Sequence, residues 1–560
     1  MTSGRAAVAG GPTRVIFLGG VGEIGRNMTV IEHGDRLLIV DVGLMFPTEE
    51  MLGVDLVIPD FQYVRERADK VLGILLTHGH EDHIGGLPYL LREISPPIFG
   101  SRLTLGLLRP KLEEHGMGKG VRMQEVKVPG QLSLAPFQLR FLQVAHSIPG
   151  GMGILVTTPA GTILHTGDFR LDQTPVDARP TDLQGFAAVG EEGVDLMLAD
   201  STNALVPGQL PSERSVGEAI KQVIRRARGR VIVTCFASHI HRVQQVLEAA
   251  EDSGRLVAFV GRSMLTNVRV ARQLGYLRVP ETLLVPIEEI GSYPASKIVV
   301  VSTGSQGEPL SALALMAARE HRFLDLESED TVVFSATPIP GNESAVRRVI
   351  DRLARIGLEV VAAPAAPVHV SGHAAAGELT FMLELVRPRC FIPIHGEYRQ
   401  LAAHARLARE AGVTPDRAVV VEDGDVVEME GGRITKVDQV QAGYVFVDGL
   451  GIGDVGDVVI RDRRLLSEDG ILVCVVTLDS QSGKMLAGPD LISRGFVYEE
   501  QAGGFYERAR TEVRESLASL ARQEATDWAV VRRHVRKALG RFVWSEVRRR
   551  PIILPVVMEV

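Results

Sequence analysis

The sequence predicts an α/β protein built from several domains. At 560 residues the chain is long enough for three or four domains of ordinary size. Its composition, 45% hydrophobic and 23% charged residues, is typical of globular proteins. Short apolar β-type runs alternate with helical segments, and polar side chains follow directly after several of these runs. Open α/β sheets carry their functional sites at such strand ends.

The net charge and the cysteines indicate which class of protein this is and in which cellular compartment it works. A net charge of −8 and a pI near 6.1 predict no general attraction to nucleic acid or membrane, although a local basic channel can still bind phosphates. Cys235, Cys390 and Cys474 lie far apart in apolar runs, which predicts buried thiols rather than a disulfide framework or a cysteine zinc site. Residues 1–13 lack the apolar core of a signal peptide, and no stretch approaches the roughly 18–20 apolar residues of a membrane span. We therefore expect a cytoplasmic protein.

The first ordered element is a strand at Arg14–Gly20, followed by a glycine-rich loop. Gly20–Gly25 satisfies the dinucleotide pattern G-x-G-x-x-G, which requires a helix after the glycines. The next segment instead predicts a hairpin from Met28–Glu32 and Leu37–Asp41, so we reject a nicotinamide site. Asp41 closes the hairpin. We expect its carboxylate to hydrogen-bond to metal-binding histidines without touching the ion itself. The alternative is that it caps a helix or a turn.

The main chemical signal is the run Thr77–Gly86, which follows an apolar strand at Val71–Leu76. Side chains at i and i+2 of an extended chain point to one side, so His78 and His80 can share an ion. Once the chain turns, Asp82 and His83 can reach a second ion. Imidazole and carboxylate suit zinc, or manganese when the oxygen share is high. Two such ions roughly 3.5–4 Å apart would clamp the attacking and leaving oxygens of a displacement.

Two further ligands are expected in similar positions downstream. His146 follows the apolar run Leu139–Val144, and Asp168 closes the run Ile163–Asp168. A carboxylate can bridge two cations, so Asp168 is the natural shared ligand and His146 completes the first ion site.

These motifs resemble a known fold. The H-x-H-x-D-H run, the later histidine and then the aspartate are similar to the metallo-β-lactamase fold, an αββα sandwich in which two sheets are flanked by helices. Small-molecule hydrolases, flavodiiron redox proteins and nucleases all occur in that fold, so the fold alone does not choose a function.

The segment after Asp200 favours one branch of that fold. The strand Val194–Ala199 leads into Asp200, and from about Ser212 helices and strands alternate for about 150 residues, which predicts an inserted α/β domain. The run Val368–His373 and a strand ending at His395 follow. Spacing and motifs resemble the β-CASP nucleases, most closely bacterial ribonuclease J, over nearly the whole chain.

The resemblance implies roles for several residues. His395 would be the last ligand of the second ion, beside Asp82, His83 and Asp168. His373, held by Asp200, would stand near the leaving oxygen. The expected catalytic residues are therefore Asp82, Asp200 and His373, and the expected metal ligands are His78, His80, Asp82, His83, His146, Asp168 and His395.

A substrate-binding loop is expected at His369, Val370, Ser371, Gly372 and His373. A helix predicted from Ala374 would offer free N–H groups and its positive dipole end to an anion. The alternative is a plain serine cap with Gly372 as a turn. Ser238, in the strand-end stretch Phe236–Arg242, is the preferred additional phosphate donor.

The predicted architecture is a metallo-β-lactamase αββα sandwich with an inserted β-CASP α/β domain and a small C-terminal α/β domain. The predicted boundaries are a flexible N-terminus at 1–13, a first metallo-β-lactamase part at 14–211, the β-CASP domain at 212–362, a return segment at 363–440, a linker at 441–469 and a C-terminal domain at 470–560. The C-terminal domain is expected to contain strands at 471–478 and 496–498, helices at 505–523 and 526–547, and a last apolar run at 552–558. Asp448 with the Glu49–Glu50 turn is a further candidate, for a peripheral cation.

The sequence therefore predicts a two-metal hydrolase that cuts RNA phosphodiesters with water activated by Zn²⁺ or Mn²⁺. The resemblance implies 5′→3′ exonuclease action on 5′-monophosphate ends, some endonuclease activity, and a role in RNA maturation and decay. Expected partners are single-stranded RNA, a second copy of the chain or a higher homo-oligomer, and an RNA-decay assembly. The alternatives are a DNA nuclease or small-molecule hydrolase of the same fold, a flavodiiron electron-transfer protein, and an inactive scaffold.

Overall fold

The computed structural model describes residues 11–48, 50–339, 341–449, 451–453, 455–495, 503–520 and 525–560. The chain divides into two compact units. Unit 1 comprises Met1–Phe46 and Leu56–Val445, and unit 2 comprises Pro47–Asp55 and Phe446–Val560. The predictions made for residues 1–10, Glu49 and the strand at 496–498 lie outside the described residues.

The first sheet of unit 1 has the strand order β22-β21-β1-β3-β4-β6-β7-β8. The hairpin predicted after the glycine loop is present as β3 and β4, which pair antiparallel. The strands are β1 (Thr13–Gly19), β3 (Met28–His33), β4 (Arg36–Val40), β6 (Val71–Leu75), β7 (Ile98–Gly100), β8 (Met123–Glu125), β21 (Asp425–Glu430) and β22 (Arg433–Gln439).

The second sheet has the order β19-β13-β12-β11-β10-β9. Its middle strands β12 and β13 are parallel, as are β13 and β19, so their carboxyl ends meet at one edge. The strands are β9 (Gly130–Leu134), β10 (Phe137–Gln143), β11 (Met152–Thr158), β12 (Gly161–His165), β13 (Leu196–Asp200) and β19 (Cys390–Ile394).

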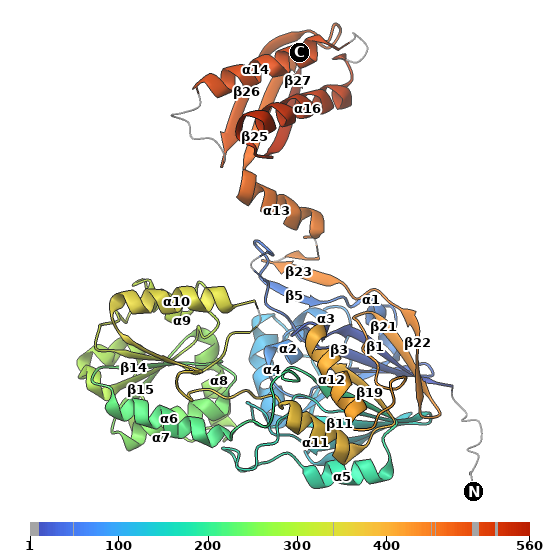
Figure 1. Cartoon of the computed structure of the whole chain (residues 1–560), viewed down its shortest axis with the longest axis vertical. Helices are drawn as coiled ribbons and strands as arrows, with labels where there is room; N and C mark the ends of the chain where they lie inside the picture. The colour runs from blue at the N-terminus through green and yellow to red at the C-terminus, as the bar shows by residue number, and fades with distance from the viewer. Residues whose placement is uncertain are drawn as a thin grey trace. The chain divides into compact units, whose positions relative to one another are not determined.

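The two sheets pack face to face on a continuous apolar core. Phe17 and Leu75 from the first sheet and Phe141, Ile154 and Leu198 from the second are fully buried in it. A second core covers the other face of the second sheet, beneath α5, α11 and α12 (Figure 1). These helices span Leu183–Glu192, Ala376–Val386 and Tyr398–Glu410. The predicted αββα sandwich is confirmed.

Shorter elements connect the layers of unit 1. They are β2 (Val21–Gly22), β5 (Leu56–Pro59), α1 (Gln62–Arg65), α2 (Glu81–Ile84), α3 (Leu87–Leu90), α4 (Arg102–Glu114) and β20 (Gly396–Glu397). The run Thr77–Gly86 contains the single helical turn α2, on which Asp82 and His83 lie, and the second turn α3 follows the run.

The inserted domain is a parallel sheet of order β15-β16-β14-β17-β18. Helices α6 and α7 lie on one side of this sheet and α9 and α10 on the other (Figure 1). The strands are β14 (Val231–Thr234), β15 (Leu256–Val260), β16 (Ile298–Ser302), β17 (Thr331–Phe334) and β18 (Glu359–Ala362). The helices are α6 (Glu213–Arg226), α7 (Ile240–Asp252), α8 (Arg262–Gln273), α9 (Ala312–Ala317) and α10 (Glu343–Ile356).

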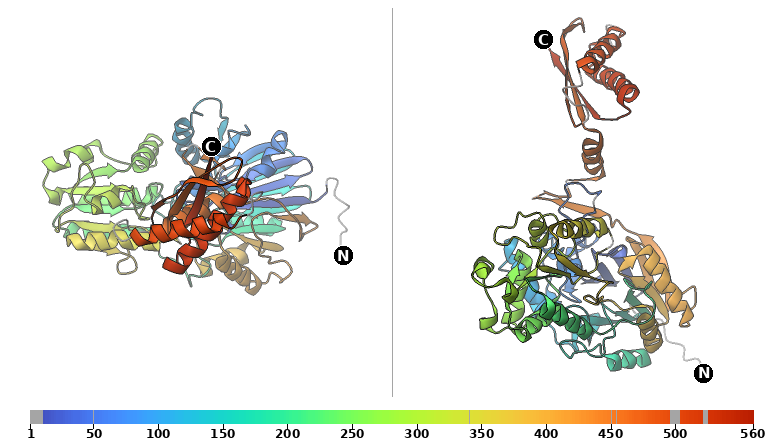
Figure 2. Two further views of the ribbon diagram at one scale, coloured as in Figure 1. Left: turned by 90° about the horizontal axis from the view of Figure 1, so that it is seen from above. Right: turned by 60° about the vertical axis from the view of Figure 1, so that its left-hand side comes forward.

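Unit 2 contains a sheet of order β26-β25-β27 with α14 and α16 packed on one of its faces (Figure 2, right). Its elements are α13 (Asp457–Asp469), β25 (Ile471–Leu478), β26 (Met485–Arg494), α14 (Gly503–Ala518), α16 (Trp528–Val547) and β27 (Ile552–Glu559). The chain enters unit 2 within β23 (Tyr444–Asp448), which pairs with β24 (Gly451–Ile452). The segment predicted as a linker therefore contains β23, β24 and α13.

The predicted burial of the thiols is confirmed, because Cys235, Cys390 and Cys474 are all free and buried. Among the described helices, none combines the length and apolar character needed to cross a bilayer.

Candidate metal centre and active site

Ligand-type side chains from both sheets of unit 1 meet where their strands end. The loop after β6 carries His78 and His80. In the second sheet, His146 follows β10 and Asp168 follows β12, while Asp200 closes β13. The buried apolar strands fix these ends, so segments far apart in sequence present their polar side chains to one small volume.

The first group consists of three histidines. The Nδ1 atom of His80 lies 3.0 Å from Nε2 of His78 and 3.1 Å from Nε2 of His146. The opposite nitrogens of the two partners are engaged: His146 Nδ1 donates to the carbonyl of Gly372 at 2.8 Å, and His78 Nδ1 lies 3.0 Å from the Thr77 hydroxyl. Such outer hydrogen bonds fix the tautomer and aim the free nitrogen at an ion.

The second group contains Asp82, His83, Asp168 and His395. His83 Nε2 lies 3.2 Å from Asp168 Oδ2, and His395 Nε2 lies 3.4 Å from Asp82 Oδ2. Asp41 supports this group, because its Oδ2 lies 2.8 Å from His83 Nδ1 and its Oδ1 accepts the backbone N–H of Thr77 at 2.8 Å. Asp41 therefore supports a histidine of this group through the ring nitrogen opposite Nε2, as expected from its place at the end of the hairpin.

Asp168 lies between the two groups. Its Oδ2 is 3.2 Å from His83 Nε2 and 3.6 Å and 3.8 Å from the Nε2 atoms of His78 and His146. This buried Oδ2 has no hydrogen-bond partner among the described residues, and neither has Nε2 of His395. Buried polar atoms are rarely left unpaired. The donor set and these two orphaned atoms therefore fit divalent cations.

His373 and Asp200 form a pair at the rim of the two groups. The Nδ1 of His373 lies 2.8 Å from Asp200 Oδ2, and its ring centroid is 4.9 Å from that of His146. The other carboxylate oxygen of Asp200 accepts the N–H and the hydroxyl of Thr202. His373 is 19% exposed, so its free Nε2 can meet a substrate.

The electrostatic environments of the two groups are opposite. Burial, reinforced by neighbouring histidines, holds the pKa of His78 and of His146 well below the usual value. Burial also lowers the pKa of His80 to about 4. In the second group burial acts in the same direction but is outweighed by carboxylates: Asp168, Asp82 and Asp41 raise the pKa of His83, and Asp168 and Asp82 raise the pKa of His395 to about 10.

Comparisons with known families agree with this geometry. The profile of the metallo-beta-lactamase superfamily matches residues 21–208, and the ribonuclease J beta-CASP domain matches 228–353. A profile described as a Zn-dependent metallo-hydrolase RNA specificity domain matches 357–418, and the ribonuclease J C-terminal domain matches 458–560. The chain is 42% identical to ribonuclease J2 of Bacillus subtilis, covering 98% of both chains, and 45% identical to ribonuclease J of Mycolicibacterium smegmatis, covering 99% of this chain and 98% of that one.

The chain belongs to the ribonuclease J family. A crystal structure of an Enterococcus faecalis protein of unknown function has a similar fold, with a TM-score of 0.53 at 16% identity over 74% of this chain and all of that one.

The loop 369–373 packs directly against the first group. A Cβ atom on Gly372 would stand 2.7 Å from His146 Cε1, so only glycine lets the loop approach this closely. His373 N–H donates to the Ser371 hydroxyl at 3.2 Å. His369 Nε2 lies 3.3 Å from the Thr337 hydroxyl, and Val370 is buried.

The loop does not use a helix N-terminus, so that prediction is wrong. Helix α11 begins at Ala376, not at Ala374, and the loop lies before it. The first N–H groups are already used, since Ala376 donates to Val206 O at 2.9 Å and Gly377 to Gly208 O at 2.8 Å. The N–H groups of Ala376 and Gly377 are therefore not free to bind an anion at this loop.

Two buried arginines hold the loop, and sequence reasoning missed both. Arg170 donates to the Ser371 carbonyl at 3.1 Å, and Arg242 donates to the Val368 carbonyl at 3.1 Å while pairing with Glu213. Nothing in the local sequence marks an arginine as fully buried. The nearest signal is position, because Arg170 follows Asp168 by two residues and Arg242 closes the stretch that contains Ser238.

Ser238 lies in the turn between β14 and α7. Its neighbour His239 is buried. The pKa of His239 is held well below the usual value by burial and Arg242, with smaller contributions from His369 and His80. Because His80 belongs to the first ligand group, its effect on His239 indicates that the turn approaches the site. No hydrogen bond of the Ser238 hydroxyl is found in the described part of the chain.

The glycine loop supports His395, a role that the sequence did not reveal. His395 has a strained φ of +52°, and its N–H donates to Gly20 O at 2.8 Å. The loop is held by Arg26, which is 1% exposed and pairs with Glu23 at 2.7 Å and with Asp423 at 2.8 Å.

The predicted peripheral cation site receives no support. Asp448 is paired with the guanidinium of Arg463, which supplies the positive charge that a cation would bring. The other predicted member, Glu49, lies outside the described residues.

Proposed function

We propose that this chain is a two-metal ribonuclease with His78, His80 and His146 on one ion, Asp82, His83 and His395 on the other, and Asp168 shared between them. The observation that carries the proposal is the buried Oδ2 of Asp168, which has no hydrogen-bond partner among the described residues and faces ring nitrogens of both groups. Zn²⁺ or Mn²⁺ bound there would supply Lewis acidity toward water and phosphate oxygens.

The side chains have distinct roles in this proposal. Asp82, whose pKa is lowered because His83 and His395 outweigh the effect of burial, stays ionised and orients the attacking water. His373 donates a proton from Nε2 to the departing 3′ oxygen. Burial lowers the pKa of His373, but Asp200 more than offsets this and raises it, which favours the protonated form that a general acid needs. Asp200 also fixes the tautomer through Nδ1.

RNA is the preferred substrate because the relatives are named ribonucleases and an RNA specificity domain matches 357–418. A flavodiiron protein is disfavoured, since His80 and His83 stand where that class would place carboxylates. An inactive scaffold is disfavoured because all seven expected ligands are present and converge. A DNA nuclease is tested directly by offering DNA of the same sequence, which we expect to be cut much more slowly.

We further propose 5′→3′ exonuclease action on 5′-monophosphate ends, with additional endonuclease activity. The terminal phosphate would be bound by the loop 369–373, chiefly Ser371, Gly372 and His373, with help from Ser238. A pocket this close to the ligands would hold the first phosphodiester at the ions after each cut.

Ser371→Ala combined with Ser238→Ala should abolish end selection while sparing internal cleavage. Wild type should cut 5′-monophosphate RNA at least about tenfold faster than 5′-triphosphate or 5′-hydroxyl RNA, because two charge-assisted hydrogen bonds are at stake. The measurement is the initial rate on matched RNAs with these three ends. Ser95→Ala, at an exposed serine far along the chain from the loop, is the control. Equal wild-type rates on all three ends would refute this use of the loop.

We also propose that the enzyme is a homodimer assembled through unit 2. One face of its sheet is covered by α14 and α16, and the opposite face is apolar and open. Val473 pairs with Leu554 and Val475 with Val556 on that open face, where Leu554 is 47% exposed. Met558 and Ile492 extend the patch. An exposed apolar patch of this kind is typical of a protein interface.

Leu554→Glu with Val556→Glu should convert a dimer into a monomer. Two charges buried at an apolar interface cost more free energy than burial of the patch provides. Light scattering during gel filtration should give two chains per particle for wild type and one for the variant. Leu310→Glu, at an 87% exposed leucine of the inserted domain, should stay dimeric. A wild-type particle of one chain would contradict the proposal.

A further inference from the structure

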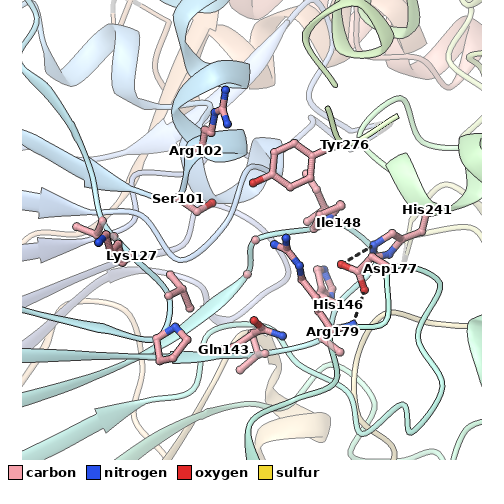
Figure 3. A pocket seen from close by; sticks show the side chains of 18 of the residues that line it. Ser101, Arg102, Lys127, Gln143, His146, Ile148, Asp177, Arg179, His241 and Tyr276 are labelled. Atoms are coloured by element: carbon pink, nitrogen blue, oxygen red, sulfur yellow. Dashed lines mark hydrogen bonds and ion pairs between the residues drawn. The ribbon is translucent and has the colours of Figure 1, made fainter. Parts of the chain in front are cut away.

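A cavity of about 350 Å³ lies beside His146, outside the two ligand groups (Figure 3). Its size falls within the range of about 300–1,000 Å³ that is usual for small-molecule sites. One wall comes from the start of α4 and from 125–129, a second from the loop after β10, and a third from His241 and Tyr276 of the inserted domain. None of the described residues 369–373, and not Ser238, is among its lining residues. The cavity is therefore separate from the loop proposed for the 5′ phosphate, although both border on His146.

Positively charged side chains outnumber carboxylates in this cavity. Arg102, Lys127 and Arg179 line it, and in the described part of the chain none of their side chains makes an ion pair or a hydrogen bond. Two carboxylates line the cavity as well. Asp177 is engaged by His241, whose Nε2 lies 3.4 Å from its Oδ2, and by the N–H of Arg179. Burial raises the pKa of Asp177, but His241 and, to a smaller extent, the charge of Arg179 outweigh this and lower it. Glu125 is the second carboxylate. Three cationic side chains around one concave surface attract a phosphate-bearing ligand.

An aromatic ring completes the chemistry of a nucleotide site. Tyr276 is half-buried, and in Figure 3 its ring reaches from the inserted domain toward Ser101. Its ring has no aromatic partner among the described residues. A ring held beside cationic groups is the usual way in which proteins bind single-stranded nucleic acid, by stacking a base and neutralising the backbone.

We propose that this cavity binds the nucleotide on the 3′ side of the bond being cut. The inference rests on the proposed function, because it takes the scissile phosphate to lie at the ligand groups. His146 joins the two spaces: its Nδ1 holds Gly372 of the 5′-end loop, and its ring forms part of the cavity wall. An RNA anchored by its 5′ end at the loop and crossing the ligands continues into the cavity. There Tyr276 stacks the second base, and Arg102, Lys127 and Arg179 contact the phosphates that follow.

The decisive experiment pairs removal of a base with removal of the ring. Five-nucleotide 5′-monophosphate RNAs carry an abasic residue at nucleotide 1, at nucleotide 2 or nowhere, and kcat/KM for loss of the first nucleotide is measured. In wild type the abasic residue at nucleotide 2 should cost about tenfold, the usual size of a base-stacking effect. In Tyr276→Ala it should cost nothing further, whereas the abasic residue at nucleotide 1 should cost the same in both proteins. Tyr276→Phe, which keeps the ring, should behave as wild type.

A binding measurement tests the cations without relying on turnover. Arg102→Gln with Arg179→Gln should weaken binding of a phosphorothioate-blocked RNA and lower its salt dependence by about 0.7 in log–log slope for each phosphate that these arginines neutralise in wild type. Arg347→Gln with Arg352→Gln, at exposed positions of α10, removes the same charge elsewhere and should change neither.

Failure of the inference is distinguishable from failure of the proposed function. If wild type does not cut RNA, the proposed function is wrong, and the binding measurement still reports on the cavity. If wild type cuts RNA but Tyr276→Ala removes the cost of the abasic residue at nucleotide 1, the cavity holds the released nucleotide and the assignment is overturned. The assignment is also overturned if the effect of Tyr276→Ala depends on neither nucleotide. Equal RNA binding by the Arg102/Arg179 variant and the Arg347/Arg352 control overturns it as well.

Discussion

Asp168→Ala should lose both metal ions and all RNA cleavage. Asp168 is 4% exposed, and its Oδ2 lies within 4 Å of ring nitrogens from both ligand groups. Its other oxygen accepts from His395 Nδ1 at 2.9 Å, so the same carboxylate also orients a ligand of the second group. Removing it takes away the shared anion and one outer hydrogen bond together. We expect kcat to fall by at least about 10³-fold, as when a member of an interdependent catalytic set is removed.

Elemental analysis after gel filtration, combined with cleavage of a 5′-labelled RNA, measures both effects. Asp168→Asn keeps the shape and removes the charge, so it separates loss of ligation from loss of packing. Asp35→Asn, at a carboxylate with a 76% exposed side chain, is the matched control and should keep both ions. A folded Asp168→Ala protein that retains two ions and cleaves RNA would contradict the bridging assignment.

The sequence predicted which side chains cluster at the centre of the candidate site, because the signal is local there. His78, His80, Asp82 and His83 fall within six residues behind one buried strand, and few structural roles need that combination. His395 carries no such signal. It is a single histidine after a short strand, 227 residues from the aspartate that it contacts, and only the resemblance to a family pointed to it.

Elsewhere tertiary contacts overrode what the sequence suggested. Ala374, Ala375 and Ala376 are all good helix formers, so nothing local delays the helix after His373. The structure delays it because Ala374 N–H is bonded to Phe169 O at 2.7 Å. Strand β26 was missed because Gly488-Pro489 indicates a turn. It tolerates the proline because it is an edge strand, paired only with β25 among the described strands and with a register shift beside it.

The two ligand groups should take up metal with different pH dependence. A histidine must be neutral to bind an ion, so a group whose pKa is raised in the metal-free site has to lose a proton first. In the first group burial keeps the pKa of His80 at about 4 and those of His78 and His146 lower than usual, so these rings are already neutral at pH 6. Binding there should release no proton, and affinity should fall only as pH drops toward about 4.

The second group behaves in the opposite way. Burial lowers the pKa of His395 and His83, but Asp168 and Asp82 outweigh it, raising the pKa of His395 to about 10 and that of His83 well above its usual value. Both rings are therefore protonated at pH 6 without metal. Loading this group should release up to two protons, one from each ring, and its affinity should rise with pH until His395 is neutral. Each proton released makes affinity change about tenfold per pH unit.

Titration calorimetry at pH 6 in two buffers of different ionisation enthalpy counts the protons released at each step. This pH lies below the range near 7 in which bound ions acidify water, so the protons counted come from the protein. The first equivalent should release none and the second more than one. His395→Gln should remove one proton from the second step, and His321→Gln, far from the ligands in the sequence, should remove none. Equal proton release in the two steps would show that the carboxylates do not divide the site in this way. The contrast rests on distance, because Asp82 and Asp168 lie 2.9–3.5 Å from ring nitrogens of His83 and His395, whereas Asp168 lies 3.6 Å from His78 and 3.8 Å from His146.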